Sequence, residues 1–227
     1  EPDEQVHYAA YAEAMDQMQG RPVVLRTCDL GADKSSFDAE TSKNPTLGLR
    51  SIRLSLKNLP LFRTQLRAVL RASSLGDLRL MFPLVATLLE LRQAKMVLAD
   101  VMEDLDEEGV AFNRDLPVGM MVEVPSAALL AARFAGEVDF FSVGTNDLTQ
   151  YALAMDRCNP RLAPQLDPFH PAVLHLIALA CKGAQTQGRW VGVCGNLAAS
   201  PLAAPVLIGL GVTELSASAN TLPEIKA

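Results

Sequence analysis

Six short apolar runs, separated by longer amphipathic segments, constrain the fold of this chain more than any other feature of its sequence. The runs are residues 23–27, 78–85, 118–124, 140–144, 190–194 and 214–218. Their side chains stay apolar until the last residue or two, which is typical of strands buried on both faces, as in a parallel sheet covered by helices. Strand and helix therefore alternate along the chain, and the sequence predicts an α/β fold.

The segments between these runs have apolar residues at helical spacing. The expected helices are residues 60–72, 84–108, 127–135, 171–187 and 201–210. The last four are followed by Gly109, Gly136, Gly188 and Gly211. A glycine there supplies the left-handed residue that ends a helix. The polar stretch 33–50 is expected to be an extended loop between a strand and the next helix.

Composition excludes several classes of protein. The 227 residues carry 20 Lys and Arg against 26 Asp and Glu, a net charge of −6, and 49% are hydrophobic. A chain of this size buries an ample core, so we expect one domain over residues 1–227. The acidic balance, with no basic cluster, argues against a general nucleic-acid or membrane-surface binder. No apolar run reaches the roughly 18 residues that suggest a membrane span.

The cysteines and the first residues bear on the cellular compartment. Four cysteines occur without CxxC spacing, and no basic-then-apolar signal segment opens the chain. We therefore expect a cytoplasmic protein with free thiols.

Polar residues of complementary chemistry stand at the ends of four predicted strands. They are Arg26, Glu123, the pair Asn146 and Asp147, and Cys194. In closed α/β barrels, chemistry gathers at the C-terminal ends of the strands. One polar residue at such a position is unremarkable, but four such positions favour a shared functional site.

Glu123 and Asp147 are hard oxygen donors of the kind that hold Mg²⁺ together with water and an anionic substrate. The alternative for either residue is a capping or solvated carboxylate. We favour the metal role for Glu123, because a carboxylate embedded in an apolar strand needs a partner. Cys194 lies before Gly195, where a ligand could approach the backbone, and a thiol there could donate a proton. Cys28 and Cys181 are expected to be inert core residues, and Cys158 an ordinary loop thiol.

Several arginines could bind an anion. Arg26 ends a strand, Arg50 enters the next helix, and Arg157 follows Asp147 by ten residues. Guanidinium groups bind phosphate or carboxylate with two parallel hydrogen bonds. Four arginines that repeat along a helical face are instead expected to form surface salt bridges: Arg53, Arg63, Arg67 and Arg71. His170 and His175 flank or lie within a helix, where packing or capping is expected.

Five motifs resemble, in order, the phosphoenolpyruvate (PEP)-binding domain of Enzyme I, the PEP-protein phosphotransferases of the bacterial sugar phosphotransferase system. They are RTCDLGADK (26–34), NPTLGLR (44–50), GMMVEVP (119–125), FFSVGTNDLTQY (140–151) and GVCG (192–195). The resemblance covers nearly the whole chain. More distantly, the chain is similar to pyruvate phosphate dikinase and PEP synthase.

The resemblance implies the roles of the site residues. Glu123 and Asp147 would hold Mg²⁺, and the Cys194 thiol would protonate the enolpyruvate carbon. The phosphate would be bound by Arg26, Asn146 and Arg157, with Lys34, Arg50 and Asp147 nearby. The implied reaction is Mg²⁺-dependent phosphoryl transfer from PEP to a histidine, which releases pyruvate in the first step of sugar uptake.

The resemblance also implies an architecture and partners. The fold would be a TIM-type (β/α)8 barrel of the PEP/pyruvate-binding type that lacks its first two strand units in this chain. Turnover would need the protein's own N-terminal phosphohistidine domain and a histidine phosphocarrier protein, and the domain would form a homodimer. A dikinase or synthase barrel and a PEP-sensing regulatory module are the alternatives.

Three residues depart from the family pattern. Ala32 stands where the family has Gly, and Asn196 and Ser200 stand where it has Glu and Asp. The loss of these two charges would alter how the proton of the Cys194 thiol is managed.

Overall fold

The computed structural model describes residues 2–29 and 44–226. Contacts divide the chain into two compact units: unit 1 is Glu1–Pro83 with Leu88–Val118, and unit 2 is Leu84–Thr87 with Gly119–Ala227. The single domain expected over residues 1–227 stays a prediction.

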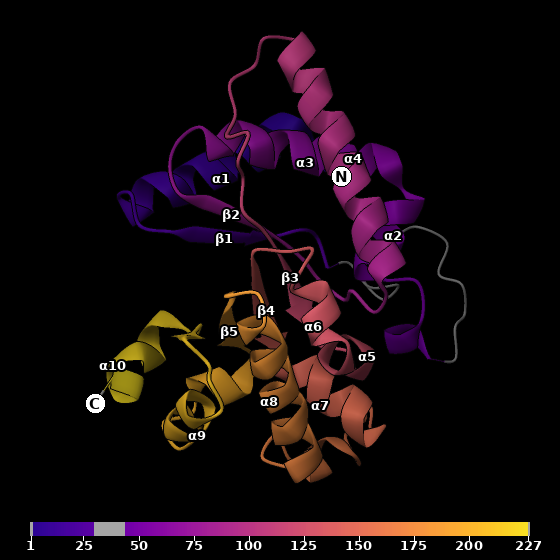
Figure 1. Ribbon diagram of the computed structural model, residues 1–227, viewed down its shortest axis with the longest axis vertical. Helices are drawn as coiled ribbons and strands as arrows, with labels where there is room; N and C mark the ends of the chain where they lie inside the picture. Colours follow the sequence, from indigo (N-terminus) through magenta and orange to yellow (C-terminus); the bar gives the residue numbers. More distant parts are fainter. Residues whose placement is uncertain (1, 30–43, 227) are drawn as a thin grey trace. The chain divides into compact units, whose positions relative to one another are not determined.

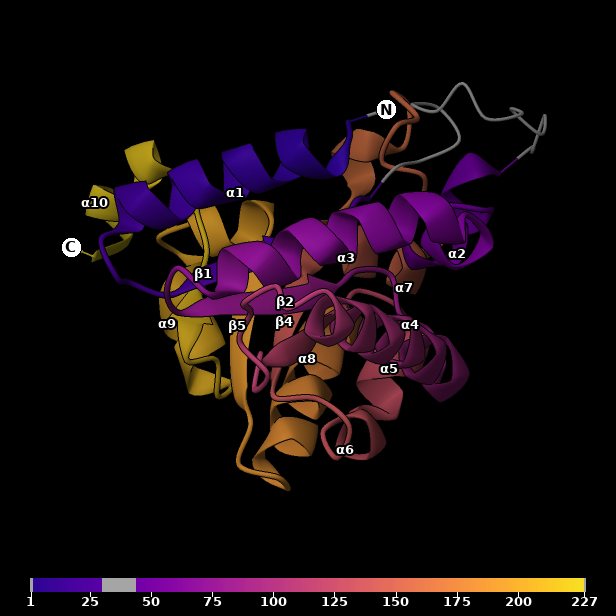
Figure 2. The same ribbon diagram turned by 90° about the horizontal axis from the view of Figure 1, so that it is seen from above.

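Unit 1 pairs two strands in parallel under a layer of helices. Its elements are α1 (Glu4–Met18), β1 (Val23–Arg26), η1 (Pro45–Leu47), α2 (Ser51–Lys57), α3 (Leu59–Ser73), β2 (Leu78–Phe82) and α4 (Leu88–Glu107). The parallel register aligns Val23 with Leu78 and Arg26 with Met81. Helices α1 and α3 lie side by side along these strands (Figure 2). Fully buried side chains of α3 and β2, including Leu66, Leu70 and Phe82, form the core.

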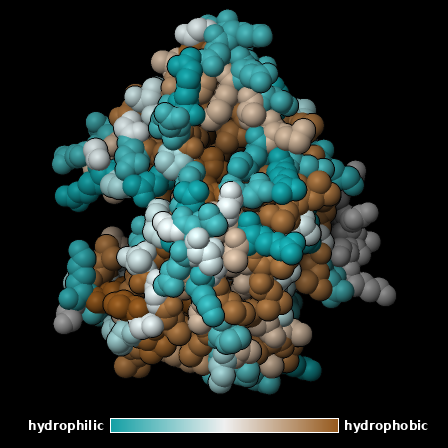
Figure 3. Space-filling view, viewed as in Figure 1, coloured by the Kyte–Doolittle hydropathy of each residue, from teal (hydrophilic) through white to brown (hydrophobic). Residues whose placement is uncertain are grey.

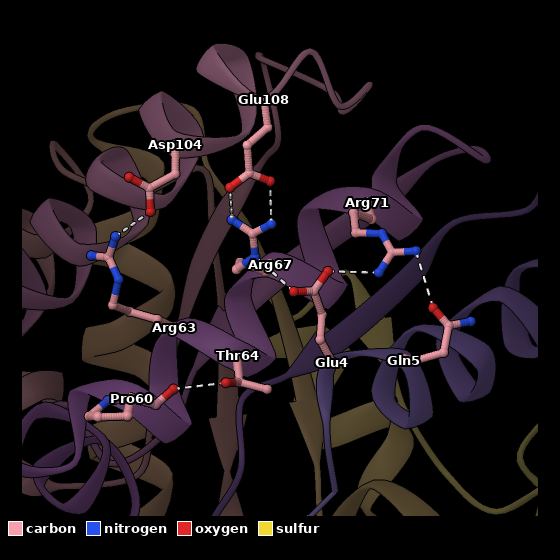
Figure 4. A network of polar contacts seen from close by, with 9 residues as sticks. All are labelled: Glu4, Gln5, Pro60, Arg63, Thr64, Arg67, Arg71, Asp104 and Glu108. Carbon is pink, nitrogen blue, oxygen red and sulfur yellow. Dashed lines mark hydrogen bonds and ion pairs between the residues drawn. The ribbon is translucent and has the colours of Figure 1, made fainter.

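The polar face of α3 is tied to its neighbours by ion pairs (Figure 4). Arg67 donates to Glu4 of α1 at 2.7 Å and to Glu108 at 2.6 Å, and Arg71 donates to Glu4 at 2.7 Å. Arg63 pairs with Asp104 of α4. The salt bridges expected for Arg63, Arg67 and Arg71 are confirmed, and they join three helices of the unit. Arg53 also forms a salt bridge, 3.1 Å from Glu90, but it lies on α2, so the single helical face predicted for the four arginines is wrong.

Unit 2 continues the alternation of strand and helix (Figure 1). Its elements are β3 (Val118–Val122), α5 (Pro125–Leu129), α6 (Ala131–Phe134), β4 (Phe140–Gly144), α7 (Thr145–Leu153), η2 (Ala163–Gln165), α8 (Pro171–Gln185), β5 (Trp190–Cys194), η3 (Asn196–Ala199), α9 (Ala203–Gly209), β6 (Glu214–Leu215), η4 (Ala219–Thr221) and α10 (Leu222–Lys226). Parallel pairing joins β3 to β4, β4 to β5 and β5 to β6.

Close packing holds the helices of unit 2 together. A β-carbon at Gly183 of α8 would lie 2.5 Å from the β-carbon of Ala131, so this glycine lets α8 pack tightly on α6.

The surface over α9 is largely apolar (Figure 3), and its exposed side chains include Leu202, Val206 and Ile208. No helix in the described part of the chain is long and apolar enough to cross a membrane.

All six predicted strands form, and the parallel α/β class is confirmed. The predicted strand 78–85 ends at Phe82, before Pro83, which lacks an N–H to donate. The predicted helix 84–108 begins at Leu88 because Leu84 has a left-handed φ of 52°. The predicted helix 127–135 divides at Leu130, whose ψ of 16° departs from helical geometry.

Three of the four predicted glycine caps are correct. Gly109, Gly188 and Gly211 have φ of 71°, 63° and 100°, whereas Gly136 does not adopt positive φ. The helix before Gly136 ends with Ala135 in the right-handed region, so no left-handed residue is needed there. His170 caps α8, since its Nδ1 accepts the N–H of Ala172 at 3.1 Å, as the capping hypothesis predicts.

Candidate functional site

Glu123 is a buried carboxylate immediately after β3 in unit 2. It is 2% exposed, and its Oε1 accepts the backbone N–H of Leu84 at 2.6 Å. That N–H belongs to a residue in the left-handed region, which is unusual for a bulky side chain. Strained backbone of this kind concentrates at functional sites. The strain at Leu84 therefore directs a donor at Glu123.

Asp147 and Asn146 follow β4, in the first turn of α7. Asp147 is 5% exposed, and its Oδ1 lies 3.3 Å from a guanidinium nitrogen of Arg157. The register places Val122 opposite Val143, so the chain leaves β3 and β4 at the same end of the sheet, toward Glu123 and Asp147. The predicted position of both carboxylates at neighbouring strand ends is confirmed.

Glu123 and Asp147 are hard oxygen donors of the kind that Mg²⁺ takes from a protein. Among the described residues, no group of three or more His, Cys, Asp or Glu side chains is arranged to hold a metal. Mg²⁺ usually takes one or two carboxylates and keeps water or substrate phosphate as its other ligands. Glu123 and Asp147 fit that pattern.

Asn146 has a defined amide orientation. Its Oδ1 accepts the backbone N–H of Asn196 at 3.0 Å. Because a backbone N–H can bond only to an acceptor, the NH₂ group is the part of this side chain suited to donate to an anionic ligand. The structure thus brings the first residue of η3 to the first turn of α7.

Cys194 is the last residue of β5 and is partly buried. Its carbonyl oxygen accepts the hydroxyl of Thr145 at 2.9 Å. The next residue, Gly195, has φ of 91°, and a β-carbon there would lie 2.7 Å from Thr145 Oγ1 and 3.0 Å from Asn146 Oδ1. Glycine is therefore needed at this position for both its conformation and its size.

Cys181 and Cys158 match their expected roles as a core residue and an exposed thiol, whereas Cys28, expected in the core, is only partly buried because β1 and the residues after it are not fully covered. All four are free thiols. Burial raises the pKa of Cys181 to about 11. Burial also raises the pKa of Cys28, against the opposing charge of Arg26. Cys158 is exposed.

Unit 1 brings together two of the predicted anion-binding arginines through Asp29. One guanidinium nitrogen of Arg50 lies 3.0 Å from each carboxylate oxygen of Asp29, and Arg26 lies 3.7 Å from Oδ2. The Arg26 side chain is 45% exposed, whereas that of Arg50 is 9% exposed. Arg50 is thus buried and holds Asp29 in place, whereas Arg26 is accessible to a ligand. Lys34 lies outside the described residues, as does Ala32.

A comparison with family models decides the family. The model described as "PEP-utilising enzyme, PEP-binding domain" matches residues 1–227. The chain belongs to this family.

Curated relatives of this PEP-binding domain carry the name phosphoenolpyruvate-protein phosphotransferase. The protein from Priestia megaterium is 48% identical over 223 residues, that from Geobacillus stearothermophilus 49% over 228, and that from Bacillus subtilis 48% over 223. These matches cover 97–100% of this chain. The chain spans 39% of the length of these relatives.

Solved structures similar to this PEP-binding domain share its fold at low identity. A citrate lyase from Burkholderia xenovorans has a TM-score of 0.57 at 17% identity, with 99% of this chain and 73% of the lyase covered. A malate synthase from Haloferax volcanii has a TM-score of 0.60 at 13% identity, with 99% and 60% covered.

Sequence reasoning missed three side chains that support the PEP-binding domain's predicted site residues. Asp29 binds Arg50, Thr145 fixes the backbone of Cys194, and Gln150 accepts the backbone N–H of Arg157 at 2.9 Å. A signal for two of them was present. Thr145, Asp147, Thr149 and Gln150 are all buried polar residues of α7, and buried polar groups need partners.

Proposed function

We propose that this chain is the PEP-binding part of a phosphotransferase that moves the phosphoryl group of PEP to a histidine and releases pyruvate. One observation carries the proposal: two buried carboxylates, Glu123 and Asp147, follow neighbouring parallel strands, and Asp147 is paired with Arg157. The curated relatives are named phosphoenolpyruvate-protein phosphotransferase, which supports phosphoryl transfer from PEP to a protein. We propose that this transfer is the first step of sugar uptake by a phosphotransferase system.

Glu123 and Asp147 would hold Mg²⁺. The ion would supply concentrated positive charge to the phosphate and enolate oxygens of the substrate. Burial is consistent with this assignment, because a bound cation offsets part of the cost of removing two carboxylates from water. Leu84 helps to hold Glu123 through its N–H, in the manner of the outer partners that orient metal ligands.

Three side chains would bind the phosphate. Arg157 and Asn146 in unit 2 offer a guanidinium and an amide NH₂, and Arg26 in unit 1 offers an exposed guanidinium. Arg50 would act through Asp29 and Arg26, and Lys34 would add charge. Such groups stabilise the transferred phosphoryl group mainly by position and charge.

Cys194 would deliver the proton that completes pyruvate. The enolate left after P–O cleavage gains a C–H bond at its methylene carbon, and the S–H electrons stay on sulfur. Thr145 and Gly195 support this role because they hold the backbone of Cys194 against α7.

The architecture and partners complete the proposal. We propose that the strands belong to a (β/α)8 barrel of the PEP/pyruvate-binding type, with two further strand units outside this sequence. The partners would be a phosphohistidine domain of the same protein, a histidine phosphocarrier protein and a second copy of the chain, all in the cytoplasm. The share of the curated relatives left uncovered leaves room for such a domain.

The test is phosphoryl transfer by the full-length parent protein. Incubation with radiolabelled PEP, Mg²⁺ and a phosphocarrier protein should label the carrier and yield an equal amount of pyruvate. Glu123→Gln and Asp147→Asn should each reduce the rate at least a hundredfold, whereas Glu103→Gln makes the same chemical change at an exposed position of α4 and should leave it unchanged. Tight PEP binding without labelling would favour a sensing module, and labelling that requires a nucleotide would favour a dikinase.

A further inference from the structure

The sulfur of Cys194 lies between two groups of the adjacent strand β4. The hydroxyl of Ser142 lies 3.6 Å from the sulfur as a donor, and the carbonyl oxygen of Val143 lies 3.5 Å away as an acceptor. Ser142 is 9% exposed. The Cys194 sulfur therefore accepts a hydrogen bond from Ser142, and its S–H donates one to Val143.

The register of β4 and β5 places Ser142 diagonally across from Cys194. The parallel register aligns Ser142 with Gly192 and Gly144 with Cys194. Alternate residues of a strand share a face of the sheet, so these four residues lie on one face. Ser142 and Cys194 therefore stand diagonally across the two strands, where their side chains meet. This contact is thus built into the sheet.

The two partners of the sulfur favour different protonation states. A carbonyl oxygen can only accept, so Val143 stabilises the thiol. A hydroxyl can donate, and its bond to sulfur strengthens when the sulfur becomes negative, because hydrogen bonds to ions are about twice as strong as neutral ones. Ser142 is thus suited to stabilise the sulfur after its proton has left.

We propose that Ser142 is a positioning residue for the proton donor: its hydroxyl orients the Cys194 thiol and stabilises the thiolate that remains when the proton moves to the enolate carbon. The catalytic part of this inference rests on the proposed function. The contact itself does not, so it can be tested without turnover.

Other ionisable groups near β5 are left unchanged by the test. Glu214 lies on β6, and His175, Cys181 and Lys182 lie on α8; both elements pack against β5. Glu123 follows β3, and its carboxylate lies beside Gly144, which aligns with Cys194. Asp147 lies on α7, which packs against β4 and η3. Variants of Ser142 keep all of these side chains. A change in the alkylation midpoint of Cys194 can therefore be assigned to the loss of the Ser142 hydroxyl.

The first experiment measures the rate of Cys194 alkylation by iodoacetamide from pH 6 to 11 in the full-length protein, followed by peptide mass spectrometry. Ser142→Ala should raise the midpoint of the Cys194 profile by about one pH unit, since the thiolate loses its donor. Ser142→Thr retains the hydroxyl and should restore the profile. Thr149→Val removes a buried hydroxyl that donates to the Thr145 carbonyl, and it should leave the midpoint in place.

The second experiment separates proton delivery from binding. Ser142→Ala should slow pyruvate formation in a single turnover about tenfold, while the Kd for PEP changes less than twofold. An unchanged alkylation midpoint in a folded Ser142→Ala protein would overturn the inference, as would an equal loss of PEP binding and pyruvate formation. If the wild-type protein does not turn over PEP, the proposed function fails, and the alkylation profile alone still decides the role of Ser142 toward the sulfur.

Discussion

A β-carbon on Gly144 would lie 2.7 Å from Oε2 of Glu123. The absence of a side chain at the end of β4 therefore makes room for the carboxylate at the end of β3. The packing of two strands and the position of a proposed metal ligand depend on the same residue.

Gly144→Ala should displace Glu123 and abolish the stabilisation of the full-length protein by Mg²⁺ with PEP, measured as a shift in Tm. The steric conflict should also cost about 1–3 kcal/mol of stability. Gly136→Ala is the matched control, because its β-carbon would meet Arg133 O at an ordinary 3.6 Å. An undiminished ligand-induced Tm shift in Gly144→Ala would contradict the role of Glu123.

Gly195→Ala should combine backbone strain with a steric conflict against Thr145 and Asn146. We expect a loss of stability of about 2–4 kcal/mol, in urea unfolding, and slower pyruvate formation. Gly188→Ala provides the control, since Gly188 has φ of 63° and nothing lies within 4 Å of its β-carbon. That variant should show the strain alone, about 1 kcal/mol. Equal effects of the two substitutions would argue against the contact with α7.

Glu4 should contribute pH-dependent stability through Arg67 and Arg71. Burial raises the pKa of Glu4, but the hydrogen bonds and charges of the two arginines outweigh it and hold the pKa below its usual value of 4.5. A lowered folded-state pKa stabilises the fold above the unfolded-state pKa, and the effect is lost as the pH falls through the folded-state value.

Glu4→Gln should therefore cost about 1 kcal/mol at pH 7 and progressively less below pH 4.5, measured by urea unfolding at each pH. Glu103→Gln on the exposed face of α4 should change stability by less than about 0.5 kcal/mol at pH 7. A Glu4→Gln effect that persists unchanged at pH 3 would show that the ion pairs are not its source.

Cys181 should resist alkylation in the folded protein. With a pKa of about 11, roughly 0.1% of this thiol is ionised at pH 8, and the side chain is 1% exposed. Exposed Cys158 should be modified by iodoacetamide within minutes at pH 8, and Cys181 only after urea is added. Modification of both thiols at the same rate without denaturant would contradict this, because it would mean that α8 moves away from its neighbours and exposes Cys181 in solution.

Much of the fold was predictable because its signals are local. The six strands are short apolar runs, and helices such as α8 begin and end near recognisable capping residues, so the pattern of a few neighbouring residues suffices. Gly136 shows the limit of such signals. It follows a helix as the other cap glycines do, yet the helix ends without a left-handed residue.

The candidate site was predictable in its members and not in their partners. Arg26, Glu123, Asp147 and Cys194 were found because a polar residue at the end of a buried strand stands out in the sequence. Their contacts join distant positions: Leu84 donates to Glu123 across 39 residues, and Ser142 to Cys194 across 52. Nothing in the local pattern of either segment specifies such a pair.

The sequence by itself determined which segments become strands and which reactive side chains follow them, because periodicity and residue type act over a few residues. The tertiary structure decided which groups hold those side chains. Strand register places Ser142 diagonally across from Cys194, and the left-handed backbone at Leu84 directs its N–H at Glu123. These relationships arise only when parallel strands pack side by side, because register and packing set distances that no local pattern encodes.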